Sequence, residues 1–424
     1  MKQKIGLWFY QAAYGCLFPF ILLLLLKRKD TRQRVLTILG FLDVETKNQP
    51  LTKTQVDWFH AVSYGETRLA MHFLSHGIEN GWVNRPVLFT TTIDNSMQYA
   101  LEYMKKNHPD HTFYASFLPL DFFPCLTGLF HSFLPVRYFL FETDFWPYTI
   151  YRLKKQGCQM YLINGRISPG IQKIAEFVPS LFMPMFQRFH CLFCQSEDTL
   201  KRFLKMGITQ TTVLSGQMKV DMLPAPKTLT PCFSLPDNFP VLVFGSFHRD
   251  EWTELLPMLQ TAYTKSIIIL VPRNIDEATW FQKQCQKSKL AAMTISAHKK
   301  TELTTTIYII NSMGFLNSIY SQASLCIVGG SFATYGGHNF LEPVALKKPV
   351  LIGPDTRNFS EDAKEFITKE LIIQLKDGQD GVTQIKKFLA NPKSLIEMSL
   401  RAWDNLQTKL GVTQSTWEKI QKKS

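Results

Sequence analysis

The chain has 424 residues, 45% of them hydrophobic, which is long enough for two ordinary α/β domains and too long for a single compact one. Its formal net charge of +13 indicates an anionic partner, which nucleic acid, an acidic membrane surface or a phosphorylated substrate would each satisfy. Composition therefore excludes a one-domain protein, and charge alone does not choose among the three partners.

The N-terminus carries an uncharged apolar stretch from Gly6 to Leu26, close to the ~20 residues that a helix needs to cross a bilayer. Only Lys2 and Lys4 precede it. The basic residues that follow it are Lys27, Arg28, Lys29, Arg32 and Arg34. By the positive-inside rule, residues 1–29 are expected to be a single-pass anchor with the rest of the chain in the cytoplasm. The alternative is a cleaved signal peptide, but no small-residue cleavage site follows the apolar run.

The eight cysteines are scattered through a chain whose bulk is expected in the cytoplasm, where thiols stay reduced, so no disulfide framework is predicted. Cys191 and Cys194 form a C-x-x-C, but no second pair stands at a metal-ligand spacing. The pair falls in an apolar, strand-like run, which favours core packing over a metal or redox site.

Beyond the anchor, short apolar runs rich in β-formers alternate with amphipathic stretches, which predicts parallel sheets with helices on both faces. The expected strands of the first half are 56–62, 85–92, 111–117, 137–143, 158–165 and 190–196. The expected strands of the second half are 241–247, 266–274, 307–313, 325–331 and 348–354.

Five prolines within residues 223–240 forbid a continuous helix or a central strand there and predict a linker. We therefore expect doubly wound domains at 30–222 and 241–424, the second ending in C-terminal helices. Open α/β sheets bind ligands at the carboxyl ends of their strands, so a cleft between the two domains is the expected site.

Residues 328–354 hold two Gly-Gly pairs, then Asn339 and Glu342. A helix is expected to begin at His338. The glycines of this loop, Gly329, Gly330, Gly336 and Gly337, would surround its N-terminus, whose free N–H groups favour a phosphate between Gly336 and Asn339. Glu342 would accept hydrogen bonds from a ribose diol. The alternative is a glycine-rich turn in which Glu342 complements the helix dipole.

Further motifs accompany this loop in order along the chain. They are "HAVSYGE" (60–66), "FETDFWP" (141–147), "INGRIS" (163–168), "CQSEDTLKRFLKMG" (194–207), "SGQMKVD" (215–221), "GSFH" (245–248) and "VPRN" (271–274). With the glycine loop they make the chain, from about residue 56 to about residue 365, resemble the bacterial 3-deoxy-D-manno-octulosonic acid (Kdo) transferases.

The resemblance implies a GT-B-type glycosyltransferase at the cytoplasmic face of the bacterial inner membrane. Such an enzyme moves Kdo from CMP-Kdo to a lipid A precursor in lipopolysaccharide core biosynthesis. The first domain would receive the lipid, the second CMP-Kdo. The implied partners are CMP-Kdo, the lipid A precursor, Kdo-lipid A and membrane lipids, with no nucleic acid. The number of Kdo units added and their linkage are not legible from the motifs.

The resemblance and the residue types together suggest roles for particular side chains. Glu66 is the expected catalytic base, although Ser63 and Glu66 also read as a helix capping box; Glu142 and Asp144 are the alternative bases. The expected acceptor or anion contacts are Ser63, Gly65, Glu142, Arg166 and Lys219. The expected donor contacts are Ser246, Arg273, Gly314, Gly329, Gly330, Gly336, Gly337, Asn339 and Glu342.

The chain departs from the family pattern at Phe247, Asn274, Asn311 and Phe315, whose side-chain roles stay open. His60 and His248 stand at strand ends, where they are expected to orient loops. No third ligand has a recognisable spacing and no Asp-x-Asp motif occurs, so neither a metal nor another cofactor is expected. The alternatives to a transferase are a GT-B sugar-nucleotide enzyme such as an epimerase, and an inactive nucleotide-binding scaffold.

Residues 118–137 combine many apolar side chains in a segment too short to span a bilayer. The apolar residues are Phe122, Phe123, Leu126, Leu129, Phe130, Phe133 and Leu134. They predict either a membrane-facing surface near the lipid acceptor or an ordinary buried helix.

Overall fold

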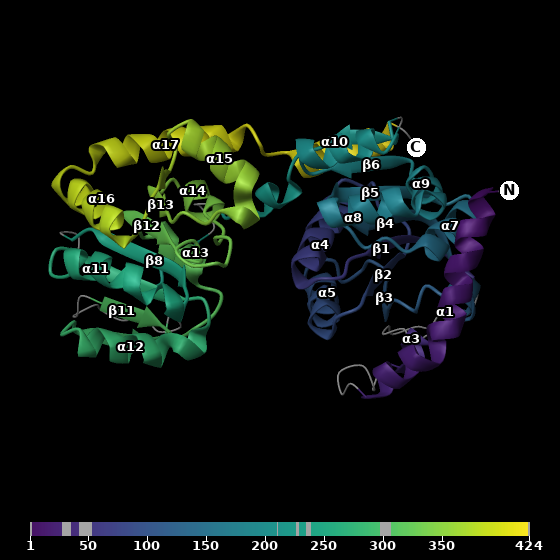
Figure 1. Ribbon diagram of the computed structural model, residues 1–424, viewed down its shortest axis with the longest axis horizontal. Coiled ribbons are helices and arrows are strands. Elements are labelled where there is room, and N and C mark those ends of the chain that lie inside the picture. Colours follow the sequence, from purple (N-terminus) through teal and green to yellow (C-terminus); the bar gives the residue numbers. More distant parts are fainter. Residues whose placement is uncertain are drawn as a thin grey trace. The chain divides into compact units, whose positions relative to one another are not determined.

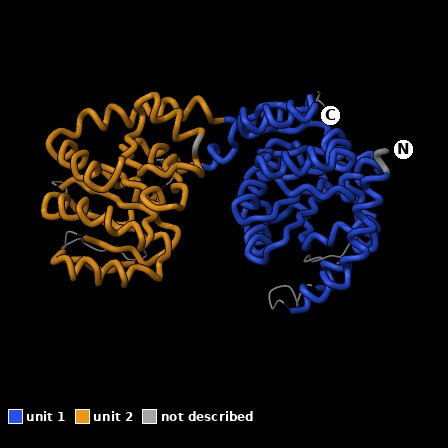
Figure 2. Tube along the Cα trace, in the orientation of Figure 1, with its two compact units in different colours: residues 1–222, 411–424 blue, residues 223–410 orange. Residues whose placement is uncertain are grey.

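The computed structural model describes residues 2–27, 35–41, 53–209, 211–225, 229–234, 239–296 and 307–422. Arg28, Lys29, Arg32 and Arg34, on which the positive-inside argument rests, lie outside these residues, as do 226–228 and 235–238 of the expected linker. The chain divides into two compact units, residues 1–222 with 411–424 (unit 1) and residues 223–410 (unit 2), coloured blue and orange in Figure 2.

Unit 1 is built on a seven-stranded, wholly parallel sheet in the order β3-β2-β1-β4-β5-β6-β7. Its strands are β1 (Thr54–His60), β2 (Val87–Thr91), β3 (Phe113–Phe117), β4 (Phe133–Phe141), β5 (Gln159–Gly165), β6 (Cys191–Cys194) and β7 (Thr212–Leu214). The central strands are buried on both faces, which explains their continuous apolar runs.

Helices cover both faces of this sheet (Figure 1). One face packs against α4 (Tyr64–Glu79), α5 (Asp94–Asn107) and α18 (Val412–Gln421). The other packs against α6 (Phe123–Ser132), α7 (Pro147–Lys155), α8 (Pro169–Phe177), α9 (Pro179–Phe186) and α10 (Glu197–Lys205). The short elements α3 (Val35–Ile38) and η1 (Met218–Met222) complete the unit.

Cys191 and Cys194 lie in β6 and are fully buried free thiols. Their odd spacing sends them to opposite faces of the sheet, where Cys191 joins one apolar cluster and Cys194 the other. The prediction of core packing is confirmed, because side chains on opposite faces cannot share one metal.

The C-terminal segment differs from the sequence prediction, which assigned it to the second domain. Residues 411–424 belong to unit 1, where Trp417 is fully buried and stacks on Phe73 with ring centroids 4.3 Å apart. Asp221 holds the start of α18 by accepting hydrogen bonds from the backbone N–H groups of Gly411 (2.8 Å) and Thr413 (2.6 Å).

The N-terminal helix α1 (Lys2–Lys27) packs along unit 1 beside α7 and α9 (Figure 1). The Gln11 side-chain amide donates to the Asp121 carbonyl (2.8 Å) and accepts from the Phe123 N–H (2.9 Å). Trp8 and Phe20, by contrast, are exposed. The segment Ile5–Lys27 is long and apolar enough to cross a membrane, a test that an N-terminal signal sequence would also pass.

The membrane-facing interpretation of residues 118–137 is wrong for most of its side chains. Leu126, Leu129, Phe130 and Phe133 are between 0% and 4% exposed and belong to the core, as in an ordinary buried helix. Phe123, at the start of α6, is 53% exposed and is the exception.

Unit 2 holds a second wholly parallel sheet, in the order β10-β11-β9-β8-β12-β13-β14. Its strands are β8 (Val241–Phe247), β9 (Ile267–Pro272), β10 (Ala292–Ile295), β11 (Ile307–Ile310), β12 (Leu325–Val328), β13 (Val350–Ile352) and β14 (Ile373–Gln374). The prediction of two doubly wound α/β domains is confirmed.

The helices of unit 2 follow the same alternation with its strands. They are η3 (Arg249–Glu251), α11 (Trp252–Ala262), η4 (Ile275–Glu277), α12 (Ala278–Lys287), α13 (Leu316–Ser321), α14 (Leu341–Ala345), η5 (Arg357–Phe359), α15 (Ser360–Thr368), α16 (Gly378–Ala390) and α17 (Lys393–Gln407). α11 and α16 lie side by side (Figure 1).

Candidate active site

Each sheet has one point at which its strand order reverses, and in open α/β sheets the crevice beyond that point binds ligands. In unit 1 the reversal lies between β1 and β4, and in unit 2 between β8 and β12. Glu66 and Glu142 follow β1 and β4, while Ser246 and the Gly329–Gly330 pair lie at the carboxyl ends of β8 and β12. These five predicted site residues therefore lie at the two switch points.

Glu66 lies in the first turn of α4, directly beyond β1. Its carboxylate accepts hydrogen bonds from the Val62 N–H (3.0 Å) and the Ser63 hydroxyl (3.0 Å), and the Ser63 oxygen accepts the Glu66 N–H (3.2 Å). The capping geometry predicted from the sequence is therefore present. Burial raises the pKa of Glu66 and the nearby charge of Glu142 adds to the rise, while the bonds from Val62 and Ser63 oppose it.

Glu142, directly after β4, and Asn164, the last residue but one of β5, have backbones in the left-handed region, at φ 58° and 52°. Non-glycine residues adopt this conformation at some cost in free energy, and such residues gather at functional sites. Lys219 forms an ion pair with the mostly buried Glu142 carboxylate at 2.6 Å. Arg166 joins the same corner through its backbone N–H, which donates to the Glu142 carbonyl (3.1 Å), while its side chain is exposed.

His60, the last residue of β1, is fully buried, and both of its ring nitrogens are bonded. Nδ1 lies 2.8 Å from the Thr90 hydroxyl and Nε2 lies 2.9 Å from the Asp144 carboxylate, which also accepts the Trp146 indole N–H (2.6 Å). His60 thus connects β1 and β2 to the loop that carries Glu142. This is the loop-orienting role expected for it.

At the switch point of unit 2, Ser246 takes a left-handed conformation (φ 61°), and the backbone of Gly329 approaches closely. A Cβ atom at Gly329 would lie 2.8 Å from the Ser246 carbonyl oxygen and from the Phe247 Cα, so only glycine fits there. Phe247, a departure from the family pattern, is fully buried and stacks on Phe332 at 5.8 Å.

The glycine loop does not offer the free N–H groups that the sequence suggested. Those of Gly330 and Phe332 donate to the Glu251 carboxylate, and that of Gly336 donates to Asp355 (2.8 Å). The N–H groups of Gly337 and His338 donate to backbone carbonyls of the same loop. The helix also begins later than predicted, at Leu341, and α14 has only 5 residues. A phosphate cradle built on a helix N-terminus between Gly336 and Asn339 does not match this geometry.

Asn339 and Glu342 lie together, as their spacing suggested: the Asn339 amide donates to the Glu342 carboxylate at 3.1 Å. Arg273 is exposed at the end of β9, and its backbone N–H donates to the Phe247 carbonyl (2.9 Å). Its positive charge helps to lower the pKa of His338. Gly314 lies in a separate turn with φ 87°.

Sequence reasoning missed a histidine pair. The Nε2 atoms of His248 and His338 are 2.9 Å apart, and the His248 ring stacks on Tyr335 at 3.8 Å. Burial lowers the pKa of His338 to about 4, with Arg273 and His248 adding to the effect, so His338 is neutral at pH 7. The signal was available, because His338 stands between the second Gly-Gly pair and Asn339.

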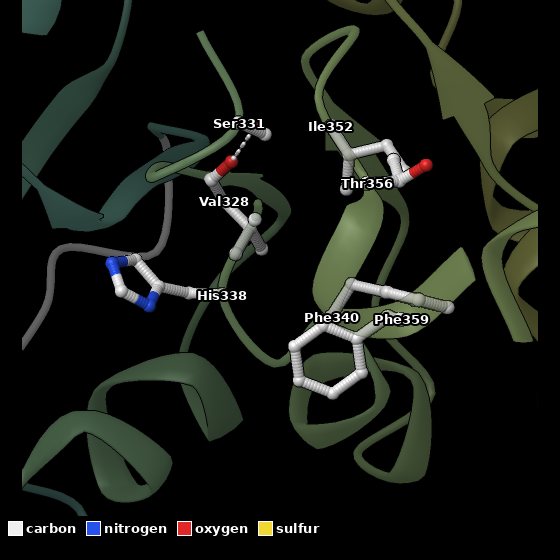
Figure 3. A pocket seen from close by; sticks show the side chains of 8 residues that line it. Val328, Ser331, His338, Phe340, Ile352, Thr356 and Phe359 are labelled. Carbon is white, nitrogen blue, oxygen red and sulfur yellow. Dashed lines mark hydrogen bonds between the residues drawn. The ribbon is translucent and has the colours of Figure 1, made fainter. Parts of the chain in front are cut away.

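A small apolar pocket lies beside the glycine loop, lined by Val328, Ser331, Gly337, His338, Phe340, Ile352, Thr356 and Phe359 (Figure 3). The empty space among these side chains, part of it open to solvent, is about 200 Å³. In the part of the chain that the structure describes, no group of three or more His, Cys, Asp or Glu side chains is arranged to hold a metal ion.

Comparison with known proteins points to one family. A family model described as "3-Deoxy-D-manno-octulosonic-acid transferase (kdotransferase)" matches residues 33–222. The 3-deoxy-D-manno-octulosonic acid transferase of Rickettsia felis is 28% identical over 347 residues, which cover 80% of this chain and 73% of the relative.

The chain is also similar to solved structures. The C-terminal CMP-Kdo binding domain of WaaA from Acinetobacter baumannii is 31% identical, with 40% of this chain and 91% of that domain covered and a TM-score of 0.37. UDP-GlcNAc 2-epimerase from Neisseria meningitidis is 12% identical, with 81% and 94% covered and a TM-score of 0.56. The latter likeness concerns the fold alone and agrees with the predicted GT-B type.

Proposed function

The chain belongs to the Kdo transferase family and is a glycosyltransferase of lipopolysaccharide core biosynthesis, and we propose that it moves Kdo from CMP-Kdo to a hydroxyl of a lipid A precursor with inversion. The acceptor hydroxyl gives its proton to Glu66 while its oxygen bonds to the anomeric carbon of Kdo. The bond from that carbon to the phosphate oxygen breaks, and CMP leaves with the electron pair.

The observation that carries this proposal is the environment of Glu66. It lies at the switch point of unit 1 with a pKa raised by burial, and a carboxylate with a raised pKa is a stronger base than an exposed one. Of the alternative bases, Asp144 accepts bonds from His60 and Trp146, and Glu142 pairs with Lys219. These partners already occupy oxygens with which either carboxylate would take the acceptor proton.

The donor is assigned to unit 2, where Arg273 supplies a cation that does not titrate and Glu342 supplies acceptors for a ribose diol. Because several loop N–H groups bond within the protein, we assign the leaving phosphate to side chains, with Arg273 foremost. Ser246, Gly314, Gly329, Gly330, Gly336, Gly337 and Asn339 form the remaining donor surface. The acceptor is assigned to unit 1 beside Ser63, Gly65, Glu142, Arg166 and Lys219.

Membrane attachment is the second part of the proposal. The helix α1 presents Trp8 and Phe20 outward, while Gln11 bonds it to residues 121 and 123 of unit 1, so the proposed anchor is attached to the proposed acceptor domain. This arrangement suits an enzyme whose acceptor stays in the bilayer. We expect a single-pass anchor in the inner membrane, with both units on the cytoplasmic side. The number of Kdo units added is left open.

The test is Glu66→Gln in the full chain, incubated with CMP-Kdo and a lipid A precursor and assayed by mass spectrometry of the lipid. We expect transfer to fall by roughly 10²–10⁴, as for the loss of a general base, with CMP affinity unchanged and melting close to wild type. Ser196→Ala is the matched control: it removes an N-cap whose hydroxyl accepts the Thr199 N–H (3.3 Å), costs about 1 kcal/mol and leaves the rate intact.

If Glu66→Gln still turned over within about tenfold of wild type, Glu66 would be a cap alone and the base would be Glu142 or Asp144. A wild-type protein that binds CMP but never adds mass to the lipid would favour an inactive scaffold. Chemical change of the sugar nucleotide without transfer would favour an epimerase-like reaction.

A further inference from the structure

The two loops at the switch point of unit 2 are joined through one buried carboxylate. Glu251, in η3, is fully buried. Its Oε2 accepts the backbone N–H groups of His248 (2.9 Å) and Gly330 (2.9 Å), and its Oε1 accepts that of Phe332 (3.0 Å). Three donors from two loops thus converge on a single side chain.

Burial of a carboxylate is costly unless hydrogen bonds or an opposite charge compensate it. Within the described residues no ion pair reaches Glu251, so the three N–H groups supply the compensation. An apolar side chain of similar size would fill the same space equally well. A carboxylate here has one evident effect, which is to fix the positions of the N–H groups that it holds.

The same two loops are joined at two more places. The Nε2 atoms of His248 and His338 are 2.9 Å apart, and the Tyr335 hydroxyl donates to Asp250 at 2.9 Å. The loop that follows β8 is therefore tied to the loop that follows β12 by backbone, ring and hydroxyl contacts. Glu251 is the fully buried member of the set, so water does not compete for its bonds.

We propose that Glu251 is a positioning residue for the donor: its carboxylate fixes the 329–337 loop against the turn after β8 and so pre-forms the surface that receives CMP. This inference rests on the assignment of the donor to unit 2. A pre-formed surface binds more tightly, because no free energy is lost in ordering the loop when the ligand binds. Glu251 touches no reacting atom, and it acts through the loop that it holds.

The direction of the change in affinity separates positioning from simple electrostatics. Glu251→Gln removes a negative charge from behind the donor loop, and for an anionic ligand that alone would leave binding unchanged or tighten it. If Glu251 positions the loop, the same substitution must weaken binding, because an amide cannot accept all three N–H groups. We expect the Kd for CMP and the KM for CMP-Kdo to rise by at least about tenfold, with kcat reduced by less than about threefold.

Glu254 provides a matched control in the same unit. Its carboxylate also accepts a backbone N–H, that of Gly378 at 2.5 Å, but it joins α11 to α16 and not to the glycine loop. Glu254→Gln should lower the melting temperature by a similar amount and leave the Kd for CMP within about twofold of wild type. Equal CMP affinity in Glu251→Gln and wild type, with melting lowered as in the control, would reduce Glu251 to a stabilising residue and overturn the proposal.

Amide hydrogen exchange of wild-type protein tests the same contact without a variant, in case Glu251→Gln fails to fold. The proposal requires the Gly330 and Phe332 amides to exchange slowly without CMP and to gain little protection when CMP binds. Strong protection that appears only with CMP would show that these amides bind phosphate and would overturn it. If wild-type protein binds no CMP, the assignment of the donor to unit 2 is wrong. Slow exchange of the Gly330 and Phe332 amides would even then support the conclusion that Glu251 fixes the loop.

Discussion

The Glu66 carboxylate has two roles: it caps the start of α4, and it is the proposed catalytic base. Burial raises the pKa of Glu66, and the nearby negative charge of Glu142 raises it further. A base acts in its ionised form, so we expect the acid limb of the kcat/KM profile above the ordinary range of a glutamate. In Glu66→Gln the residual activity should lose this limb. An unchanged limb in that variant would assign the titration to another group.

The raised pKa of Glu66 also affects the stability of the fold, which it lowers as pH rises. Because the folded pKa lies above the unfolded one, the contribution of the Glu66 carboxyl to stability is complete below the unfolded pKa and declines as pH rises through the folded pKa. Glu66→Gln removes this decline. The free energy of unfolding of the variant should therefore equal or exceed that of wild type near neutral pH, as expected of a catalytic rather than a structural residue.

Gly65 offers a second test at the scale of one residue. A Cβ atom at this exposed position would meet nothing within 4 Å, and Gly65 lies inside α4. Alanine there should stabilise unit 1 by about 0.5–1 kcal/mol, because glycine is the poorer helix former. If the acceptor approaches this backbone as proposed, the methyl group should raise the KM for the lipid at least severalfold. Improved melting with an unchanged KM would remove Gly65 from the acceptor site.

At the scale of elements, the central strands were predictable because burial on both faces forces long apolar runs. Three edge strands were missed: β7, β10 and β14 have 3, 4 and 2 residues, and none reads as a continuous apolar run. Such short pairings are set by the neighbouring strand rather than by their own sequence.

The candidate site was predictable in part for a related reason. The motifs place Glu66, Arg273 and the glycines at the ends of strands. The location of a switch point follows from the strand order, which the alternation of strands and helices indicates. What the loop N–H groups bond to depends on side chains distant in sequence: Glu251 lies 79 residues from Gly330. No local pattern signals that contact, and for this reason the sequence could not show that the Gly330, Phe332 and Gly336 N–H groups bond to side chains of the protein.

Two exposed aromatic side chains of unit 1 make a membrane-facing surface testable. Phe123 at the start of α6 is 53% exposed and Phe177 at the end of α8 is 88% exposed. Glutamate at either position should leave folding intact and weaken the binding of an α1-deleted protein to anionic liposomes, since each removes apolar burial and adds repulsion. Phe239 in unit 2, 50% exposed, is the control. Unchanged liposome binding in both variants would confine membrane contact to α1.

Phe130 makes a useful contrast, because the sequence grouped it with Phe123. It is only 4% exposed and packs in the core of unit 1, so Phe130→Glu should prevent folding rather than alter membrane binding. Circular dichroism on the two variants distinguishes a surface residue from a core residue within one helix.

At the scale of the whole molecule, the chain leaves unit 1 near residue 222 and returns to it at residue 411. The return is held by Trp417, whose indole N–H donates to the Phe73 carbonyl (2.9 Å) and whose ring fills the space over Gly77. The C-terminal segment therefore contributes to the core of unit 1. Sequence periodicity could not show this, because α18 follows α17 with the pattern of any further helix of unit 2.

Trp417→Ala tests which unit depends on this segment. Loss of a fully buried tryptophan should cost about 3–5 kcal/mol, because it leaves a cavity against Phe73. Hydrogen exchange should then accelerate in peptides from residues 54–222 and stay unchanged in those from 241–410. Trp403→Ala in α17 removes a half-buried ring from under the Lys347 ammonium. In this variant, exchange should accelerate in peptides from residues 241–410 and stay unchanged in those from 54–222. If Trp417→Ala instead loosened residues 241–410, α18 would stabilise unit 2, as the sequence had suggested. Unit 1 would then have to fold without the last helix of the chain.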